Sequence, residues 1–498
     1  MSLDTLLSPL AFMQRMGVAL PDGDALKEYE SWWQVTGQAI SDAVDRAGTP
    51  HLRMFDALGQ RIDQVLYPPD YWTMLHRGYA EGAVWRALEA QSVIPAYGVN
   101  YLTSFFDVGL VCPYTVSLST ALPLAKYGSQ EVRDRFLPPM LRRDASVWQG
   151  ATWMTEVRGG SDLGAGVETV ASLHSPLPTV GEEPGVRAYY LTGDKYFASN
   201  AGAELAVVAA RPEGAPPGVR GLALFLVPKW RANGTLNYTI RRLKDKIATR
   251  SVPTGEVELR GSEGYLLGAP EQGIYLILEV LNISRVANSV GSAALAQRAL
   301  ADAYAFACQR VAFGRPVIEH PLLRRQFAER FAGLERAFAL AWEAACLLDQ
   351  VWQERPPYSE RYHLFRLVAH LAKYWTAEFA AQTAKWALEA YAGVGTLAEN
   401  RVERWLREAM ILAIWEGTPH RQMLDALEVM ERKNAHHLLF DHLGADADPQ
   451  ALEALAARLD DHLALPQEEK EAGIEPLFRD LAEFTAGSLA RRRERVAL

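Results

Sequence analysis

The hydrophobic periodicity of the chain changes twice, which divides the sequence into a helical block, a β-rich block and a second helical block. Up to about residue 150, apolar residues recur every three or four positions, as at Met74, Leu75 and Tyr79, and this spacing is typical of amphipathic helices. The next block contains short β-rich stretches separated by Gly and Pro turn signals. These stretches are 188–192, 205–209, 222–227, 236–240 and 256–259. Because no helices alternate with them, we expect no βαβ units.

The apolar spacing typical of helices returns at about residue 274 and continues to the end of the predicted bundle at about residue 435. One helix face there carries a stripe of large apolar residues, which we interpret as core packing: Phe327, Phe331, Leu334, Phe338 and Trp342. Pro and Gly breaks at 356–357 and 393–395 divide this block into about four long helices, as in a bundle. The predicted fold is therefore α+β, with an N-terminal helical domain (1–150), a middle β-domain that is a barrel or sandwich (151–273), a C-terminal four-helix bundle (274–435) and an acidic helical tail (436–498).

The charge of the chain limits what it can bind. The sequence has 51 Lys and Arg residues against 60 Asp and Glu residues, a formal net charge of −9. This balance argues against a general polyanion binder, because phosphate contacts need a basic surface. The tail is also acidic, with 7 Lys and Arg residues against 13 Asp and Glu residues, a formal charge of −6. We interpret its arginine-rich end, 491–495, as a solvated helix end.

Composition and cysteine content exclude further classes of protein. The 498 residues are 49% hydrophobic and 22% charged, which excludes extensive disorder. Cys112, Cys308 and Cys346 lie far apart in the sequence, so we expect neither a disulfide framework nor a zinc site. The first residues lack the basic region of a secretory signal, and no run reaches the roughly 18 apolar residues of a membrane helix. We therefore expect a soluble, cytoplasmic protein without a membrane partner.

Several common site motifs are absent from the sequence. There is no P-loop, no GxGxxG after a strand, no HExxH and no GxSxG, so these nucleotide, zinc and serine-hydrolase sites are not indicated. The eleven histidines show no metal-ligand spacing. His436 and His437 are adjacent, and neighbouring helix positions point in different directions. We interpret this pair as surface residues and expect no metal site.

Three segments remain as candidates for chemistry. The first, 153–162, contains Thr155, Ser161 and the doublet Gly159-Gly160. Its hydroxyls and its backbone N–H groups could hold a polar heterocycle or a pyrophosphate. The alternative interpretation of this segment is an ordinary turn.

The second and third candidates lie at predicted helix ends. In 412–418 an apolar run leads to Glu416 and then Gly417. Desolvation there could raise the pKa of Glu416 toward that of a general base, although a water-exposed carboxylate is an equal alternative. In 310–316 the sequence Arg-Val-Ala-Phe-Gly-Arg-Pro ends a long predicted helix. A plain helix stop explains this segment as well as a functional role does.

The order of these segments resembles one known family. A TE-x-x-GGSD loop, a KYFASN strand at 195–200, an R-x-x-FG helix end and a late WEGT follow one another, as in the acyl-CoA dehydrogenase family of FAD flavoproteins. The resemblance covers about residues 60 to 432. Details are similar to the branch that contains the alkylation-response protein AidB. These details are the Gly159-Gly160 doublet, the basic segment 241–247 with Arg250-Ser251, and Trp415 in place of the usual Tyr.

The resemblance implies a reaction and a catalytic base. Glu416 would remove the α-proton of an acyl-CoA thioester, while its backbone N–H would help to polarise the thioester carbonyl. The β-hydrogen would leave as hydride to flavin N5, and an electron-transfer flavoprotein would accept the electrons. Some family members place the base just before the arginine of the first bundle helix. That position here is Ser284, before Arg285, and serine cannot act as this base.

The resemblance also implies cofactor contacts and an oligomer. The residues that match FAD-binding positions are Thr155, Ser161, Phe197, Ser199, Arg310, Phe313, Gly393 and Thr418. Within this set, Arg310 and Phe313 match a motif that reaches the FAD of a neighbouring subunit. A homo-oligomer is therefore expected, at least a dimer, with a tetramer as the favoured state.

Departures from the family pattern leave other functions open. Ala312 replaces a common glutamine, and His420 replaces a frequent glutamine after the base. These differences put ordinary β-oxidation substrates in doubt, or they are neutral. One alternative is a DNA-associated flavoprotein of the alkylation response with little dehydrogenase turnover, although the acidic tail makes a nucleic-acid partner unfavourable. Another alternative is an oxidase that passes electrons to oxygen.

Overall fold

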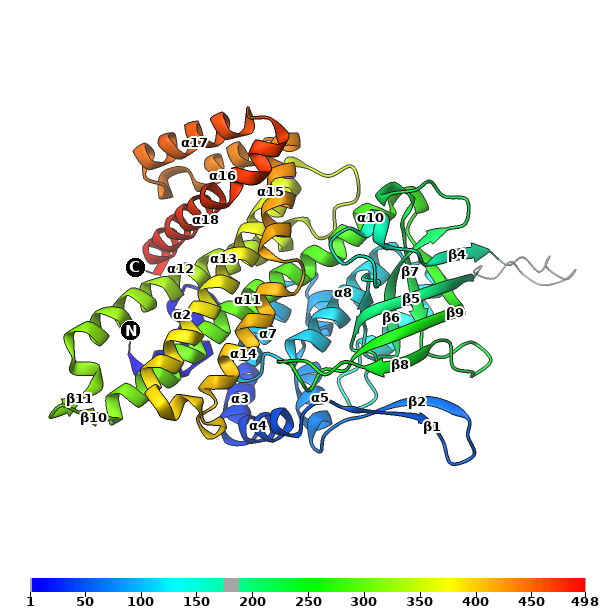
Figure 1. Ribbon diagram of the computed structural model, residues 1–498, viewed down its shortest axis with the longest axis horizontal. Coiled ribbons are helices and arrows are strands. Elements are labelled where there is room, and N and C mark those ends of the chain that lie inside the picture. The colour runs from blue at the N-terminus through cyan, green and yellow to red at the C-terminus, as the bar shows by residue number, and fades with distance from the viewer. Residues whose placement is uncertain (1, 174–187, 498) are drawn as a thin grey trace, which may run out of the picture. The chain divides into compact units, whose positions relative to one another are not determined.

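The computed structural model describes residues 2–173 and 188–497 and has the α+β architecture that the periodicity predicts (Figure 1). The chain divides into two units. Unit 1 comprises Met1–Gln38, Val93–Val108 and Arg285–Leu498, and unit 2 comprises Ala39–Ser92 and Gly109–Ser284. The long helix α11 (Gly273–Gln309) contributes residues to both.

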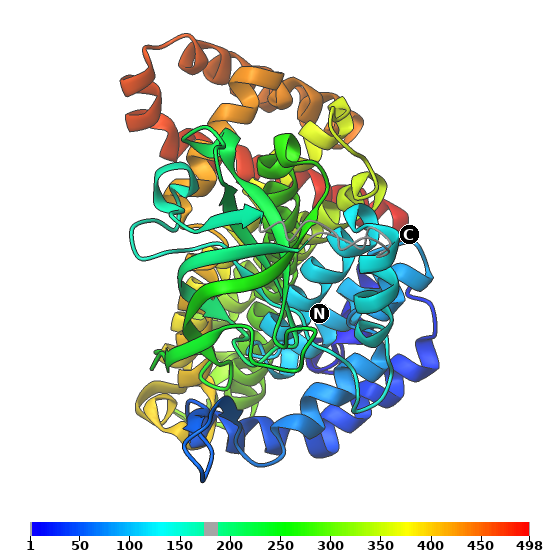
Figure 2. The ribbon, with the colours of Figure 1, turned by 90° about the vertical axis from the view of Figure 1, so that its right-hand side faces the viewer.

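The β-rich block forms a seven-stranded sheet in unit 2, whose strands face the viewer in Figure 2. Its strands are β3 (Thr152–Trp153), β4 (Val170–Leu173), β5 (Tyr189–Ser199), β6 (Leu205–Pro212), β7 (Ala223–Pro228), β8 (Thr239–Leu243) and β9 (Thr254–Leu267). The strand order is β3-β6-β4-β5-β9-β7, and β7 also pairs with β6. Strands β6, β4, β5, β9 and β7 therefore close into a ring, so of the two predicted architectures the domain is a barrel.

The core of the barrel consists of the apolar residues of these strands. Leu191, Val208, Phe225, Ile240 and Leu259 are all fully buried. Burial of such side chains stabilises the fold by about 1.5–3 kcal/mol each. Strands β6 and β7 are buried along almost their whole length, which explains why their sequences are continuous apolar runs.

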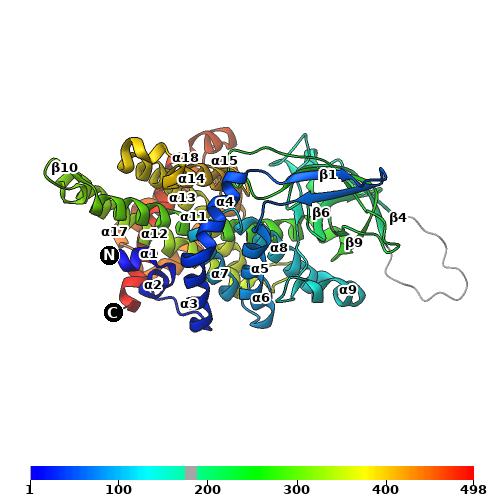
Figure 3. The same ribbon diagram turned by 90° about the horizontal axis from the view of Figure 1, so that it is seen from below.

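One strand pair was missed because it lies in the block that reads as helical. Strands β1 (His51–Phe55) and β2 (Arg61–Leu66) form an antiparallel hairpin, in which His51 pairs with Leu66. Figure 3 shows this hairpin beside the barrel strands of unit 2. Its sequence alternates polar and apolar residues around Gly59, which has a φ of +81°, so period-two alternation was the signal for it.

Helices complete unit 2. They are α4 (Gln38–Ala47), α5 (Tyr71–Glu81), α6 (Trp85–Glu89), α8 (Val111–Tyr127), α9 (Gln130–Met140) and the short α10 (Leu163–Gly166). Helix α8 is buried over nearly all of its length. At its C-terminal end the Lys126 Nζ lies 2.8 Å from the Glu279 carboxylate of α11, to which the Tyr127 hydroxyl also donates a hydrogen bond of 2.6 Å.

Unit 1 is a helical assembly that contains several very long helices. Its helices are α1 (Leu3–Leu7), α2 (Pro9–Arg15), α3 (Gly23–Trp32), α7 (Ile94–Phe106), the second part of α11, α12 (Pro321–Val351), α13 (Glu360–Tyr391), α14 (Val402–Ile414), α15 (Pro419–Lys433), α16 (Ala435–Leu443), α17 (Pro449–Leu463) and α18 (Gln467–Ala497). Helix α13 packs against α12, α14 and α15. Four members of the predicted apolar stripe are buried, whereas Phe331 is half-buried against Tyr304.

The C-terminal arginines correct one expectation. The helix end is solvated only in part: Arg491 and Arg495 are exposed, whereas Arg492 pairs with Asp446 at 2.5 Å and donates to the His442 backbone oxygen at 2.6 Å. Arg493 donates to the Met16 backbone oxygen at 3.1 Å. These contacts fix α18 to other parts of unit 1. A helix-dipole interaction is weaker than such multiple polar contacts.

No helix within residues 2–173 and 188–497 combines the length and the apolar character that a membrane span requires. Cys112 is buried, and Cys308 and Cys346 are half-buried.

Candidate functional site

The Glu416 segment is a short loop between α14 and α15 in unit 1. Helix α14 ends at Ile414, Trp415 turns to an extended conformation, and α15 begins at Pro419. Glu416 has a φ of +57° and Gly417 has a φ of +102°. The left-handed region is unfavourable for a residue such as glutamate. The surrounding contacts must therefore hold this residue in place.

Lys373 and Gln422 hold the backbone of this loop. The Lys373 ammonium, on α13, donates to the backbone oxygens of Ala413 and Gly417, both at 2.7 Å. The Gln422 amide, on α15, donates to the backbone oxygens of Glu416 at 3.0 Å and Gly417 at 3.1 Å. Both side chains are buried. Each donor satisfies carbonyl groups that the end of a helix leaves without intrahelical partners.

Arg285 on α11 adds a third donor to the loop. Its Nε donates to the Glu416 backbone oxygen at 3.2 Å, and its terminal nitrogen pairs with Asp425 at 3.0 Å. His370 on α13 hydrogen-bonds through Nδ1 to the Gln422 side chain at 2.9 Å. Burial, followed by the charge of Arg285, lowers the pKa of His370 to about 3. The imidazole is therefore neutral and acts as a fixed part of the support.

The Glu416 carboxylate differs from the loop backbone in its lack of partners. Within residues 2–173 and 188–497, no side chain or backbone group hydrogen-bonds or ion-pairs with it. Burial raises the pKa of Glu416 to about 7, while the positive charges of Arg285 and Lys373 act in the opposite direction. Burial likewise lowers the pKa of Lys373 to about 7, and the charge of Glu416 opposes that shift. A carboxyl group that titrates near neutral pH suits proton transfer.

The backbone N–H of Glu416 is a second functional group of the loop. In the described part of the chain it has no hydrogen-bond acceptor, whereas the neighbouring N–H of Trp415 donates to Ile411 at 2.9 Å. A fixed N–H without a protein acceptor can donate to a ligand carbonyl. The loop thus presents an acid–base group and a hydrogen-bond donor from one residue.

In unit 2, the candidate loop around Thr155 is joined to strand β5. The Tyr196 N–H donates to the Thr155 backbone oxygen at 3.0 Å. Beside it, the Lys195 ammonium lies 2.6 Å from the Glu156 carboxylate, and both are buried. Gly159 packs so closely that a Cβ there would lie 2.7 Å from the Asp162 backbone oxygen. This packing requires glycine at position 159, while Val157 and Arg158 form an exposed turn between Glu156 and Gly159.

The residues of unit 2 that are expected to bind the cofactor lie on the Thr155 loop and on strand β5. Thr155 is half-buried and Ser161 is exposed. At the end of β5, Ser199 is half-buried and the Phe197 ring is 52% exposed. The Lys244 ammonium lies 4.7 Å from the centre of that ring. An exposed aromatic face beside free hydroxyls fits the ring and the polar edge of a heterocyclic ligand.

Arg310 and Phe313 lie on a hairpin between α11 and α12. Strands β10 (Val311–Ala312) and β11 (Arg315–Pro316) pair around Phe313 and Gly314, whose φ angles are +53° and +81°. The structure therefore has a tight two-residue hairpin here and not a plain helix stop. Phe313 is 96% exposed and Arg310 is exposed. Figures 1 and 3 show the hairpin at the end of α11 and α12, apart from the loop between α14 and α15.

The last two expected ligand residues also lie in unit 1. Gly393 is exposed in a 3₁₀ turn after α13, and a Cβ there would meet no atom within 4 Å. Packing therefore does not require glycine at this position. Thr418 is half-buried, two residues after Glu416, and is the N-cap residue of α15 without a side-chain capping bond. Thr418 therefore belongs to the same loop as Glu416.

Sequence analysis missed the residues that support both sites. Lys373, Gln422, His370 and Asp425 surround the Glu416 loop, and Arg285 had been noted only as the neighbour of Ser284. A signal existed for two of them, because His370 and Lys373 interrupt the apolar run of a helix. Burial of a basic residue requires a partner, but the sequence does not identify which carbonyl or carboxylate that partner is.

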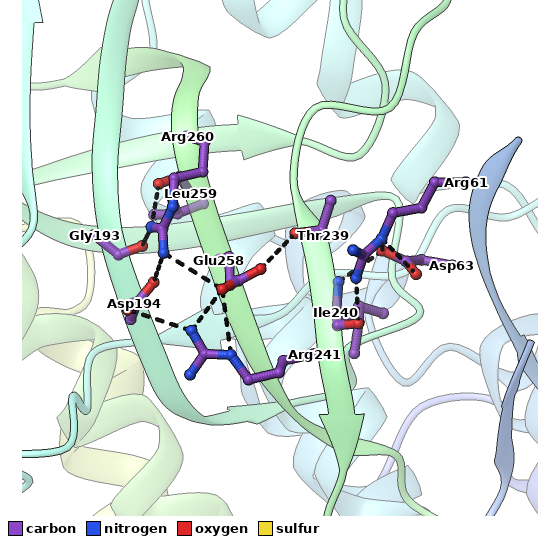
Figure 4. Close-up of polar contacts among 10 residues, drawn as sticks. All are labelled: Arg61, Asp63, Gly193, Asp194, Thr239, Ile240, Arg241, Glu258, Leu259 and Arg260. Carbon is purple, nitrogen blue, oxygen red and sulfur yellow. Dashed lines mark hydrogen bonds and ion pairs between the residues drawn. The ribbon is translucent and has the colours of Figure 1, made fainter. Parts of the chain in front are cut away.

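Three of the four cations in the basic segment 241–247 pair with carboxylates. Figure 4 shows Arg241 and Arg260 around Glu258 and Asp194, with distances of 2.5 Å from Arg241 to Glu258 and 2.7 Å from Arg260 to Asp194. Arg242 and Lys244 both pair with Glu256, at 2.7 and 2.8 Å. Cations that are paired in this way contribute little to phosphate binding.

Comparisons with known proteins agree with this arrangement. Three family models match the chain: the C-terminal domain of acyl-CoA dehydrogenase over residues 271–430, its middle domain over 151–262, and the N-terminal domain of the adaptive response protein AidB over 17–145. Together, the two acyl-CoA dehydrogenase models cover more than half of the chain.

Individual relatives match over most of their length. Acyl-CoA dehydrogenase family member 11 of Caenorhabditis elegans is 29% identical over 425 residues, or 81% of this chain and 67% of that protein. AidB of Escherichia coli (strain K12) is 28% identical over 440 residues, or 84% of this chain and 76% of that protein.

Among solved structures, the apo-form of Bd2924 has a TM-score of 0.86 at 29% sequence identity. The match covers 99% of this chain and 96% of the Bd2924 chain. The fold is also that of ACDH-11 of Caenorhabditis elegans in complex with C11-CoA, with a TM-score of 0.82 at 24% identity over 95% of this chain and 84% of that one. An acyl-CoA dehydrogenase from Bacillus anthracis, complexed with FAD, shares the fold with a TM-score of 0.69 at 19% identity over 85% of this chain and 75% of that one. This chain belongs to the acyl-CoA dehydrogenase family of FAD-binding oxidoreductases, and its N-terminal part is of the AidB type.

Proposed function

We propose that this protein is an FAD-dependent acyl-CoA dehydrogenase that introduces a double bond between the α and β carbons of an acyl-CoA thioester. The observation that carries the proposal is the Glu416 carboxylate, which has no protein partner among the described residues and a pKa raised to about 7. Its loop backbone is held by three donors, from Lys373, Gln422 and Arg285. A fixed base with a pKa near the working pH is the arrangement that general base catalysis favours.

In this proposal Glu416 removes the α-proton of the thioester and becomes neutral. Its backbone N–H donates to the thioester oxygen and stabilises the negative charge that develops there. The charges of Arg285 and Lys373 keep the carboxyl ionised often enough to act at neutral pH. Exclusion of water from the loop by buried neighbours strengthens both interactions.

The residues of unit 2 fit an FAD ring system. Thr155 and Ser161 offer hydroxyl groups, the Gly159-Gly160 backbone allows close approach, and Phe197 offers an exposed aromatic face. Ser199 would hydrogen-bond at the edge of the ring. When bound, FAD supplies a two-electron acceptor that takes the β-hydrogen as hydride at N5.

In unit 1, we propose that Thr418 and Gly393 contact FAD, and that the hairpin with Arg310 and Phe313 reaches the FAD of a neighbouring subunit. The exposure of Phe313, at 96%, supports a contact outside its own chain, because such an exposed aromatic residue gains little from packing within the subunit. A homodimer or homotetramer then follows, with an electron-transfer flavoprotein as electron acceptor in cytoplasmic fatty acid metabolism.

The test is an anaerobic titration of the FAD-loaded protein with a panel of short, branched and long acyl-CoAs. The panel includes an eleven-carbon thioester, because ACDH-11 has been solved with C11-CoA. We expect bleaching of the flavin absorbance by at least one thioester. The matched variants are Glu416→Gln, which should not bleach, and the exposed Glu399→Gln, which should behave as the wild type. Bound FAD with no bleaching by any thioester would overturn the proposal.

Two alternatives are separated by simple measurements. An oxidase of the same fold would be reoxidised rapidly in air after reduction.

A DNA-associated flavoprotein is favoured by the AidB-type N-terminal part, whereas the net charge of −9 and the paired arginines of Figure 4 disfavour it. Binding to duplex DNA that weakens steeply with salt would support this second function, and no binding at low salt would exclude it.

A further inference from the structure

A cluster of three potential metal ligands lies outside the Glu416 loop, in the C-terminal tail of unit 1. His436 and His437 are in the first turn of α16, and Asp460 is near the end of α17. Their ligand atoms all lie within 4.8 Å of one another. This convergence corrects the expectation that the two adjacent histidines point away from each other: their ring centroids are 4.1 Å apart.

The expectation that both are surface residues is also wrong for one of them. His436 is buried at 2% exposure, whereas the His437 side chain is 54% exposed and that of Asp460 is 53% exposed. A buried imidazole that faces a half-exposed imidazole and a carboxylate forms a site with one wall in the protein and one side open to solvent. Such an opening allows a cation to enter.

The two separations that involve Asp460 are close to those of a tetrahedral zinc site. His436 Nε2 lies 3.2 Å and His437 Nε2 lies 3.5 Å from Asp460 Oδ1. Ligands at the usual zinc distances of about 2.0–2.2 Å stand about 3.3–3.5 Å apart in a tetrahedron. The two exposed side chains can rotate, so small adjustments would complete the geometry around a fourth ligand from water.

The charge of the cluster also favours a cation. Among the described residues, Asp460 has no Lys or Arg partner, and its side-chain contacts are the two histidines. Imidazole nitrogens and carboxylate oxygens are both metal ligands, and a bound cation would supply a positive partner for the Asp460 carboxylate.

We propose that His436, His437 and Asp460 form a zinc site that joins α16 to α17. Two imidazole nitrogens and one carboxylate oxygen are a common set of ligands for Zn²⁺, and the same set also accepts Co²⁺. The bound ion stabilises the folded tail, because these ligands do not converge in the unfolded chain. The site is independent of the acyl-CoA chemistry proposed for Glu416.

The test uses the full-length, tag-free, FAD-loaded protein after removal of metals with EDTA. Zn²⁺ binding is measured by titration calorimetry, and Co²⁺ binding by its visible absorption at wavelengths beyond the flavin bands. We expect one ion per chain and a higher thermal unfolding midpoint with Zn²⁺. His437→Ala and Asp460→Asn should each weaken binding by at least about tenfold. Both residues are half-exposed, so neither change should prevent folding.

Two matched variants serve as controls. Asp461→Asn removes an exposed carboxylate next to Asp460, and His51→Ala removes an exposed histidine in unit 2. Both should bind Zn²⁺ as the wild type does. The proposal is overturned if the wild type binds no stoichiometric Zn²⁺ or Co²⁺, or if His437→Ala and Asp460→Asn bind as tightly as the controls. A failure of acyl-CoA dehydrogenation would not affect this result.

Discussion

Two glutamates, the buried Glu156 of unit 2 and the half-buried Glu416 of unit 1, show how the same side chain serves opposite purposes. Glu156 accepts hydrogen bonds from the Lys195 ammonium at 2.6 Å, the Thr169 hydroxyl at 2.6 Å and the Glu168 N–H at 2.8 Å. Glu416 has no such partner among the described residues, and burial raises its pKa to about 7. A fully paired carboxylate fixes a loop, whereas an unpaired one is available for proton transfer.

The loops around these residues are held by opposite means. In unit 2 the side chain of Glu156 joins the Thr155 loop to β5 and to Thr169. In unit 1 the donors of Lys373, Gln422 and Arg285 bind only the backbone of the Glu416 loop. The comparison predicts that changes at Glu416 affect reaction rate and changes at Glu156 affect stability.

The largest expected effect is kinetic. Glu416→Gln should slow flavin reduction by acyl-CoA by about 10²–10⁴-fold, the usual contribution of a general base. Stopped-flow absorbance under anaerobic conditions measures this rate. Because the carboxylate has no described partner, the thermal unfolding midpoint of the variant should not fall. A variant that reduces its flavin at the wild-type rate would show that Glu416 is not the base.

The next effect concerns stability. Glu156→Gln leaves the buried Lys195 ammonium without its counter-charge, which typically costs about 3–5 kcal/mol. Denaturant unfolding followed by circular dichroism measures the loss. Adding Lys195→Met removes the unpaired charge, so the double variant should recover part of the stability. Equal stability of Glu156→Gln and the wild type would show that the ion pair does not fix this loop.

The pH dependence of the reaction should follow Glu416. Since its pKa is raised to about 7, flavin reduction should increase as the pH rises through about 7, because only the ionised form is a base. Lys373→Met removes a positive charge that opposes this rise in pKa, so the acid limb of the profile should move to higher pH. Lys373→Arg keeps the charge and serves as the control. An unchanged profile in Lys373→Met would argue against this electrostatic coupling.

The same pKa has a consequence for stability, with a definite sign. Glu416 has a pKa of about 7 in the folded protein and an ordinary value of 4.5. The folded state therefore binds more protons than the unfolded state between these values, and its stability decreases as the pH rises from 4.5 to about 7. Urea unfolding at several pH values should show a smaller decrease in Glu416→Gln than in the wild type.

The smallest expected effect is on cofactor affinity. Phe197→Ala removes an aromatic face that is half-exposed, so FAD binding should weaken by about 0.5–1.5 kcal/mol, the value of an aromatic stacking contact. Fluorescence titration of the apoprotein with FAD measures this change. The exposed Val170→Ala on β4 is a control in the same barrel. Unaltered FAD affinity would remove Phe197 from the proposed site.

Part of this description could be predicted from local patterns. The strands β5, β6, β7, β8 and β9 each overlap a predicted β-rich stretch, because their apolar and β-branched residues produce a local signal. The hairpin of β1 and β2 was missed because it is short and lies among helices. Glu416 was singled out because an apolar run precedes it, but its support by Lys373 and Gln422 depends on helices that are distant in sequence.

By itself, the sequence determined the order of helical and β-rich parts, the family and the positions of the candidate loops, since periodicity and short motifs are local properties of the chain. Only the tertiary structure decided which buried charges are paired. Lys195 lies 39 residues from its partner Glu156, and Arg285 lies 131 residues from Glu416. Burial and electrostatics depend on such long-range contacts, which set the pKa of Glu416 and bring Asp460 to the two histidines of the proposed zinc site.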